Sequence, residues 1–177
     1  MKKISVMLWL LTLAGCSNSE NPYGAKIDSN GCLVCDNYVA GETFMLKGLR
    51  YEVADRTRLR LAIDDNEDLS RFCTSKVSDM SSLFENQSSF NQNISSWDVS
   101  SVTDMSWMFE QAYAFNQDIG NWDVSGVTDM DKMFKDATSF NRNLSNWCVA
   151  ELSFEPSEFS LNSALIASNH PVWGTCP

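Results

Sequence analysis

The sequence is poor in the residues on which most catalytic sites depend. Its 177 residues include a single histidine, His170, and no glycine-rich phosphate loop. Nucleophilic triads and general-base catalysis usually use a histidine, and a lone histidine in a C-terminal segment is far more often structural. The recurring carboxylates have structural explanations as turn and cap residues. We therefore expect a protein that is not an enzyme and that binds no cofactor.

Basic clusters and long apolar segments are also scarce. The net charge is −10, and no basic run follows Lys3. This balance argues against nucleic acid as a partner, because a phosphate backbone selects clustered lysine and arginine. The apolar stretch over residues 4–13 has ten residues, whereas a membrane-spanning helix needs about 20. We read this stretch as part of a targeting segment.

The N-terminus has the organisation of an export signal. Lys2 and Lys3 precede the apolar stretch, and Leu-Ala-Gly-Cys ending at Cys16 follows it. This motif resembles the lipobox of bacterial lipoproteins, which implies cleavage before Cys16 and a diacylglycerol on its thiol. Ser17 is not the aspartate that often retains lipoproteins in the inner membrane. We expect a signal peptide over residues 1–15, a lipidated cysteine and tether over 16–23, and a surface-exposed position on the outer membrane.

A 25-residue period dominates the middle of the chain. Asp-Met pairs recur at Asp79, Asp104 and Asp129, and several apolar columns keep the same spacing. Such self-similarity is the signature of repeat architectures. The columns predict a repeat region over residues 68–150, with three full units and one degenerate unit. They are Phe90, Phe115 and Phe140; Ile94, Ile119 and Leu144; Trp97, Trp122 and Trp147; Val99, Val124 and Val149.

Each unit is predicted to hold one helix and one strand. Met105, Met108, Phe109 and Ala112 have the i, i+3, i+4, i+7 spacing of an amphipathic helix. Residues 115–124 are rich in aromatic and β-branched residues, which favours a short strand. Stacked units would form a parallel sheet and a continuous core. The expected fold class is an α/β repeat solenoid of leucine-rich-repeat type, with a parallel strand plus a short helix in each rung.

The wording of the unit is itself specific. The run WDVSGVTDMDKMF over residues 122–134, followed by SFN at 139–141, resembles the BspA-like family of leucine-rich-repeat surface proteins, whose repeat is also known as a lipoprotein-associated domain of unknown function. The resemblance implies a leucine-rich-repeat-like fold and a cell-surface location. It implies adhesion only loosely, and a chain with three full units offers little concave surface.

Flanking segments are expected to cap the repeats. In the N-terminal cap, residues 24–67, the apolar-rich runs Thr43–Leu46 and Leu49–Val53 predict a hairpin. Asp55 is placed to cap a helix over Arg56–Asp64. The C-terminal cap, residues 151–177, lacks the repeat but carries enough apolar residues to cover the last unit.

Five cysteines remain once Cys16 is assigned to lipid, and export permits disulfides. Cys73 and Cys148 occupy one repeat column three units apart, about 14 Å by strand spacing, which is too far for a bridge. We expect Cys148 to pair with Cys176. Cys73 is expected to pair with either Cys35 or Cys32.

The Cys32–Cys35 motif and the acidic residues were considered as metal or cofactor sites. Haem attachment needs a histidine where Asp36 stands, zinc needs a second ligand pair, and a redox site needs a βαβ context. Calcium on Asp118, Asp123 and Asp129 is the alternative to turn and cap hydrogen bonding. We expect turn bonding and no metal.

Residues that break the repeat columns are the candidates for ligand contact. Trp107 stands where other units have Ser82 and Lys132, and Tyr113 replaces a serine and a threonine. Exposed aromatics are common at interfaces. We predict a contact patch at Trp107 and Tyr113 on a membrane-anchored module that binds a protein or glycan. The alternative is a structural or assembly lipoprotein that contacts other envelope proteins.

Overall fold

The computed structural model describes residues 24–177. The predicted signal peptide, the lipidation at Cys16 and the tether lie outside the described residues. No helix within residues 24–177 is both long and apolar enough to cross a membrane.

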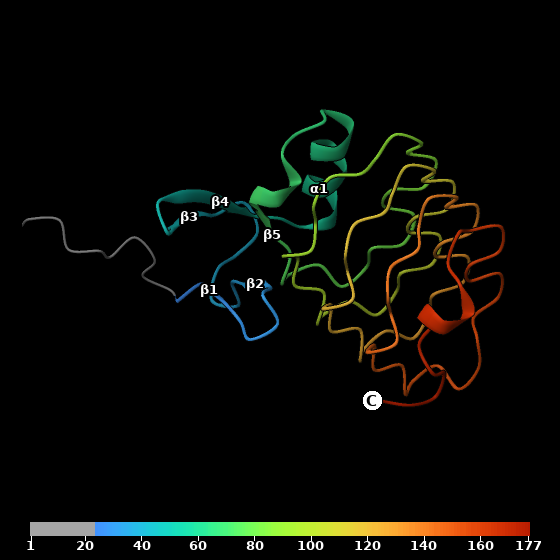
Figure 1. Ribbon diagram of the computed structural model, residues 1–177. Coiled ribbons are helices and arrows are strands. Elements are labelled where there is room, and N and C mark those ends of the chain that lie inside the picture. The colour runs from blue at the N-terminus through green and yellow to red at the C-terminus, as the bar shows by residue number, and fades with distance from the viewer. Residues whose placement is uncertain (1–23) are drawn as a thin grey trace, which may run out of the picture.

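Regular secondary structure is concentrated in residues 24–73, which we call the N-terminal region (Figure 1). Strands β1 (Lys26–Ile27) and β2 (Leu33–Val34) form a two-stranded antiparallel sheet. Strands β3 (Thr43–Leu46) and β4 (Leu49–Val53) form a hairpin, and β5 (Phe72–Cys73) pairs in parallel with β4. The turn of the hairpin is Lys47-Gly48, both at positive φ, and its bounds confirm the prediction.

The predicted helix is also confirmed as α1 (Arg56–Asp64). Asp55 caps it, because its carboxylate accepts a hydrogen bond of 2.8 Å from the N–H of Arg58. Leu59 and Ala62 are buried in the main core, so α1 packs against the following units. A single 3₁₀ turn, η1 (Leu69–Arg71), connects the helical segment to β5.

The predicted α/β repeat solenoid of leucine-rich-repeat type is wrong. Within residues 24–177 there are one α-helix and two small sheets of two and three strands, and no strand lies beyond Cys73. The turn region, residues 74–177, consists of turns, isolated bridges and the 3₁₀ helix η2 (Ala167–Asn169). The described chain is therefore a small mixed α/β domain, and no rung carries the expected strand and helix.

The apolar stripe that predicted a helix is buried without being helical. Met105 and Phe109 are fully buried, but Trp107 and Gln111 have φ values of 57° and 58°. A left-handed residue at every fourth position is incompatible with an α-helix. The N–H of Trp107 instead donates to the carbonyl of Asp131 in the next unit, at 2.8 Å. Consecutive turns thus reproduce the helical spacing of buried side chains.

The expected strand over residues 115–124 is replaced by side-chain hydrogen bonds. The N–H of Asn116 donates to the Asn91 side-chain oxygen at 3.0 Å, and the N–H of Asn141 donates to that of Asn116 at 3.2 Å. The indole N–H of Trp122 donates to the carbonyl of Ile94 at 3.3 Å. These bonds join successive units through side chains instead of through a β-ladder.

The aspartates of the units close turns. Asp104, predicted to cap a helix, accepts hydrogen bonds from the N–H and hydroxyl of Ser106 at 2.9 and 2.6 Å. Asp123 holds Ser125 in the same way. The prediction is therefore correct for the turn at Asp123 and wrong for the helix cap at Asp104.

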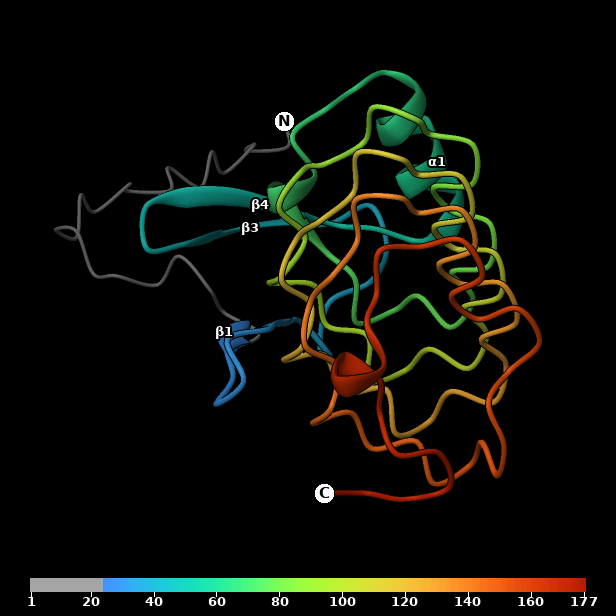
Figure 2. The ribbon, with the colours of Figure 1, turned by 45° about the vertical axis from the view of Figure 1, so that its right-hand side comes forward.

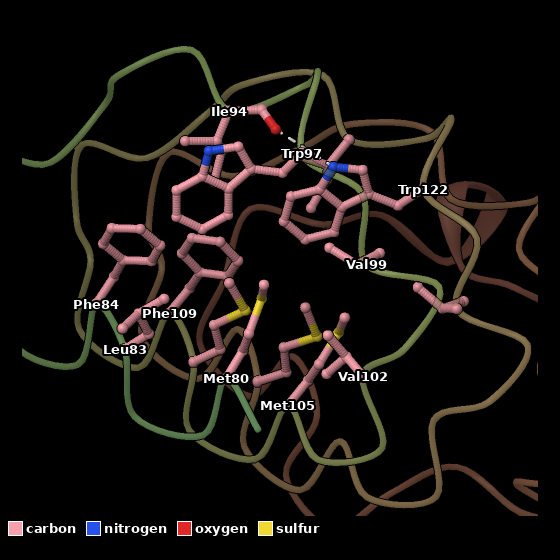
Figure 3. Close-up of a cluster of buried hydrophobic side chains, with 14 of the residues drawn as sticks. Met80, Leu83, Phe84, Ile94, Trp97, Val99, Val102, Met105, Phe109 and Trp122 are labelled. Atoms are coloured by element: carbon pink, nitrogen blue, oxygen red, sulfur yellow. Dashed lines mark hydrogen bonds between the residues drawn. The ribbon is translucent and has the colours of Figure 1, made fainter. Parts of the chain in front are cut away.

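Successive turns lie side by side in both views of the ribbon (Figures 1 and 2) and share one core. Phe84, Phe109 and Phe134 stack with ring centroids 5.3 and 5.6 Å apart. Figure 3 shows Trp97 beside Trp122 above the methionines of the same core. The packing of like residues from successive units is what the sequence columns encode.

Candidate functional site

The two aromatic residues predicted to contact a ligand are both exposed. Trp107 is 37% exposed and Tyr113 is 44% exposed, whereas Phe109 and Phe115 between and beyond them are buried. The outward orientation expected for this pair is confirmed. The turn region thus presents two large aromatic side chains on its middle unit.

The backbone conformation at position 107 gives no reason for a tryptophan there. Its φ of 57° is matched by 54° at Ser82 and 57° at Lys132, so the left-handed geometry belongs to the position. Glycine or asparagine satisfies such geometry better than a bulky side chain. A tryptophan here therefore adds nothing that the turn requires.

A charged surface adjoins this position. The ammonium of Lys132 lies 5.8 Å from the centre of the Trp107 ring, a cation–π distance. Nearby along the same units, Lys135 pairs with Glu158 at 2.7 Å and with Glu110 at 3.6 Å. The hydrogen bond between Lys135 and Glu158 raises the pKa of Lys135 and lowers that of Glu158. Trp107 is thus an exposed aromatic ring with the Lys132 ammonium beside it.

A polar hollow of about 590 Å³ lies where the β1–β2 turn meets the turn region. Asn121 is one of its lining residues, and its side-chain N–H₂ donates to the carbonyl of Asn30 at 2.9 Å and to that of Ser95 at 3.0 Å. Carboxamides and hydroxyls can bind hydroxyl-bearing ligands, but most of Asn121 is committed to holding the two regions together. The lining residues are Asn30, Gly31, Ser95, Asp118, Gly120, Asn121, Asn143 and Asn146.

The carboxylates considered for calcium are dispersed over separate turns. Asp118 accepts the N–H of Gly120 at 3.2 Å, Asp123 accepts that of Ser125, and Asp129 accepts that of Asp131 at 2.9 Å. Within residues 24–177, no three acidic, histidine or cysteine side chains are grouped to hold a metal ion. Each of the three carboxylates therefore makes the turn hydrogen bond that was the alternative to calcium binding.

The cysteines pair as two disulfides. Cys148 bonds to Cys176, and Cys73 bonds to Cys35, which settles the choice between Cys35 and Cys32. Cys32 is a buried free thiol. Burial, followed by nearby carboxylates of which Asp28 is the largest contributor, raises its pKa to about 12. A thiol held protonated in this way is a poor nucleophile.

One arrangement around the lone histidine was missed by the sequence analysis. The hydroxyl of Ser160 lies 3.3 Å from Nε2 of His170, and Nδ1 lies 3.7 Å from the carboxylate of Glu155. The ring also packs edge-on against Phe159. The order is that of a catalytic triad, but Glu155 is solvent-exposed and both distances are long. None of the described hollows is lined by Ser160 or His170, so we assign the trio to packing of the last unit.

These features define a small mixed α/β domain whose turn-built part displays aromatic, charged and amide side chains, with no cluster of metal-ligating side chains in residues 24–177. The family model described as "Mycoplasma protein of unknown function, DUF285" matches residues 56–170, and the chain belongs to this family. The matched segment begins at the first residue of α1. No curated protein and no solved structure matches the chain.

Proposed function

We propose that the protein is a lipid-anchored module of the cell envelope that binds an extracellular macromolecule. The observation that carries the proposal is the exposure of Trp107 at a left-handed turn position where the fold favours a smaller residue. Tyr113 extends the exposed aromatic surface. Family membership is consistent with a surface protein, and the BspA-like wording of the units supports the same class.

The chemistry of the patch favours a protein or glycan ligand. Tryptophan and tyrosine supply large contact areas at small entropic cost and are enriched among the residues that dominate binding energy. Lys132 places a positive charge beside the Trp107 ring. A charge at the edge of an interface affects orientation and on-rate more than affinity.

Binding should be measured with the purified full chain in detergent. Immobilised extracellular-matrix proteins and an array of neutral and acidic oligosaccharides are the probes. For a probe that binds, Trp107→Ala is expected to weaken affinity on the order of 30-fold, the scale of a dominant interface residue. Tyr113→Ala is expected to weaken it less.

The matched control is Phe154→Ala. Phe154 is an aromatic residue of the last unit that is 84% exposed, so its loss tests whether any exposed ring matters. Unchanged binding by this variant, with loss in Trp107→Ala, supports the patch. Equal binding by the wild type and both patch variants contradicts it.

The alternative is an assembly lipoprotein that contacts other envelope proteins. The observation that favours it is the set of exposed apolar side chains on the last unit: Phe154, Leu161, Ile166 and Val172. Cross-linking in intact cells distinguishes the two functions. A constant envelope partner supports assembly, whereas cross-links only to added extracellular ligand support the binding module.

A further inference from the structure

The units of the turn region are joined by a directional row of backbone hydrogen bonds. In the middle unit, the N–H groups of Trp107, Phe109 and Gln111 donate to carbonyls of the following unit at 2.8, 2.9 and 2.9 Å. The next unit repeats the row, since Lys132, Phe134 and Asp136 donate onward at 2.9, 2.8 and 2.8 Å. Every unit therefore presents donors toward the C-terminal end and acceptors toward the N-terminal end.

The last unit presents the same donors without acceptors. Its left-handed residues Glu158 and Asn162, with φ of 51° and 60°, correspond to Lys132 and Asp136 of the unit before. The row there is Glu158, Ser160 and Asn162. Among residues 24–177, the N–H groups of these three residues donate to no protein acceptor, while the intervening Phe159 and Leu161 close local turns.

The opposite end of the turn region lies against α1. Arg56 of α1 donates to the carbonyls of Asp79 and Ser81 at 2.9 and 2.5 Å, and Arg60 reaches the carbonyl of Ser82 at 3.3 Å. A guanidinium thus replaces the N–H donor at Ser81, whereas the carbonyls of Leu83 and Glu85 accept no hydrogen bond from residues 24–177. The two ends therefore differ: α1 lies against the acceptor end, whereas the N–H donors at the other end have no acceptor among residues 24–177.

Apolar side chains accompany the open donors. Leu161, between Ser160 and Asn162, is 47% exposed, and Phe154 of the same unit is 84% exposed. An unpaired backbone edge with apolar neighbours is a template for pairing with another chain. We define the donor edge as the N–H groups of residues 158, 160 and 162 with the side chain of Leu161.

We propose that the donor edge is a docking site for a partner protein that presents backbone carbonyls at alternate residues in the same turn geometry. The occupant is inferred from the two preceding units, where such a row of carbonyls covers the equivalent donors. A second copy of this chain fits less well, because α1 lies over its acceptor end: Arg56 occupies the carbonyl of Ser81, and Arg60 and Ile63 adjoin Leu83 and Glu85. Two donor edges cannot pair with each other. The proposal stands independently of the Trp107 patch.

The test uses ¹⁵N-labelled full-length protein in detergent and a synthetic peptide copying residues 127–151. That segment supplies the carbonyls that cover the middle unit. Titration is expected to shift the amides of Glu158, Ser160 and Asn162 and to slow their hydrogen exchange. A scrambled peptide of the same composition should leave them unchanged.

Matched variants separate the backbone bond from the side chain. Ser160→Pro removes the central N–H and is expected to weaken peptide binding about tenfold, whereas Ser160→Ala keeps the N–H and should bind normally. Because proline can disturb the turn, Leu161→Lys is the second variant; it retains all three donors, places a charge on the edge, and should also weaken binding.

Three results would overturn the proposal. The first is no protection of the three amides at about 1 mM peptide, which is the weak limit of specific binding. The second is protection confined to other parts of the chain. The third is self-association of the protein through these amides, seen by sedimentation without peptide, because it would make a second copy the occupant.

Discussion

The N-terminal region and the turn region differ in how their backbone N–H and carbonyl groups are hydrogen-bonded. Residues 24–73 contain the strands and the α-helix of the described chain, whose backbone groups bond within those elements. Residues 74–177 satisfy them between units, through N–H groups such as that of Phe109 and side chains such as Asn116. The first arrangement follows local propensity, whereas the second exists only when neighbouring units are in place. Stability in the turn region should therefore depend on contacts between units.

The largest expected effect is the loss of a shared ring. Phe109 is fully buried and stacks on Phe84, Phe115 and Phe134. Phe109→Ala should lower the free energy of unfolding by about 4 kcal/mol, the scale of a buried aromatic truncation. Urea denaturation measures this, with Phe44→Ala in the separate N-terminal cluster as the comparison.

Phe44→Ala should lower stability by about 3 kcal/mol, because its cluster is smaller. A loss below about 1 kcal/mol in Phe109→Ala would show that the turn units do not depend on the stacked rings.

Removal of the disulfide within the N-terminal region should rank second. Cys35 and Cys73 are 38 residues apart in sequence, and the paired change Cys35→Ala, Cys73→Ala should lower stability by about 3–4 kcal/mol by releasing the unfolded chain. The N–H of Leu33, bonded to the carbonyl of Ser96 at 2.8 Å, should exchange faster with solvent. Hydrogen exchange checks this.

The matched comparison for the disulfide is Cys148→Ala, Cys176→Ala, whose partners are 28 residues apart. It should produce a similar loss of stability while leaving the protection of Leu33 intact. Equal loss of protection at Leu33 in both variants would mean that the two regions unfold as one unit.

A smaller effect is expected where units approach most closely. A Cβ on Gly120 would lie 2.5 Å from the carbonyl oxygen of Asn143 in the next unit. Gly120→Ala should therefore destabilise the protein by about 1–3 kcal/mol. At Gly126 the nearest atoms are 3.7 Å away, so Gly126→Ala should be neutral or stabilising by up to about 1 kcal/mol. Thermal unfolding of both variants measures the two changes in stability. A larger loss in Gly126→Ala than in Gly120→Ala would contradict the close contact between units at Gly120.

The smallest effect tests the left-handed turns. Gln111 has a φ of 58°, whereas Gln87 does not have a positive φ, and both are half-buried. Gln111→Gly relieves backbone strain while Gln87→Gly only adds entropy to the unfolded chain. The former should be more stable than the latter by about 1 kcal/mol in chemical denaturation. Equal stabilities would argue against left-handed geometry at position 111.

Sequence reasoning succeeded where local chemistry decides the structure. Lys47-Gly48 between apolar runs predicted the β3–β4 hairpin, and Asp55 predicted the start of α1. The pairing of Cys148 with Cys176 followed from the position of Cys148 at the end of the repeats. Each of these inferences depends on a few residues whose preferences are strong on their own.

The same reasoning failed in the turn region because its signal is ambiguous. Buried residues at the spacing of Met105, Met108 and Phe109 fit an α-helix and also fit consecutive turns. The deciding feature is the positive φ at Trp107 and Gln111, and neither residue type favours that conformation. The bonds that hold it come from the next unit, so the fragment alone contains no local signal.

The candidate site was only partly accessible from sequence. Trp107 and Tyr113 were found because they break repeat columns, and both are exposed. The donor edge could not be found in this way, because it consists of backbone N–H groups whose direction depends on the turns. The covering of the opposite end by Arg56 was hidden for the same reason, since its acceptors are carbonyls.

The most direct test of the proposed function is protease treatment of intact cells that express the full-length protein, with Cys16→Ala as the comparison. The proposal predicts that external protease removes the wild-type protein while an internal control survives, and that Cys16→Ala is not retained on the cell surface. Protection of the anchored wild-type protein until the cells are opened would contradict an extracellular binding role and favour assembly inside the envelope.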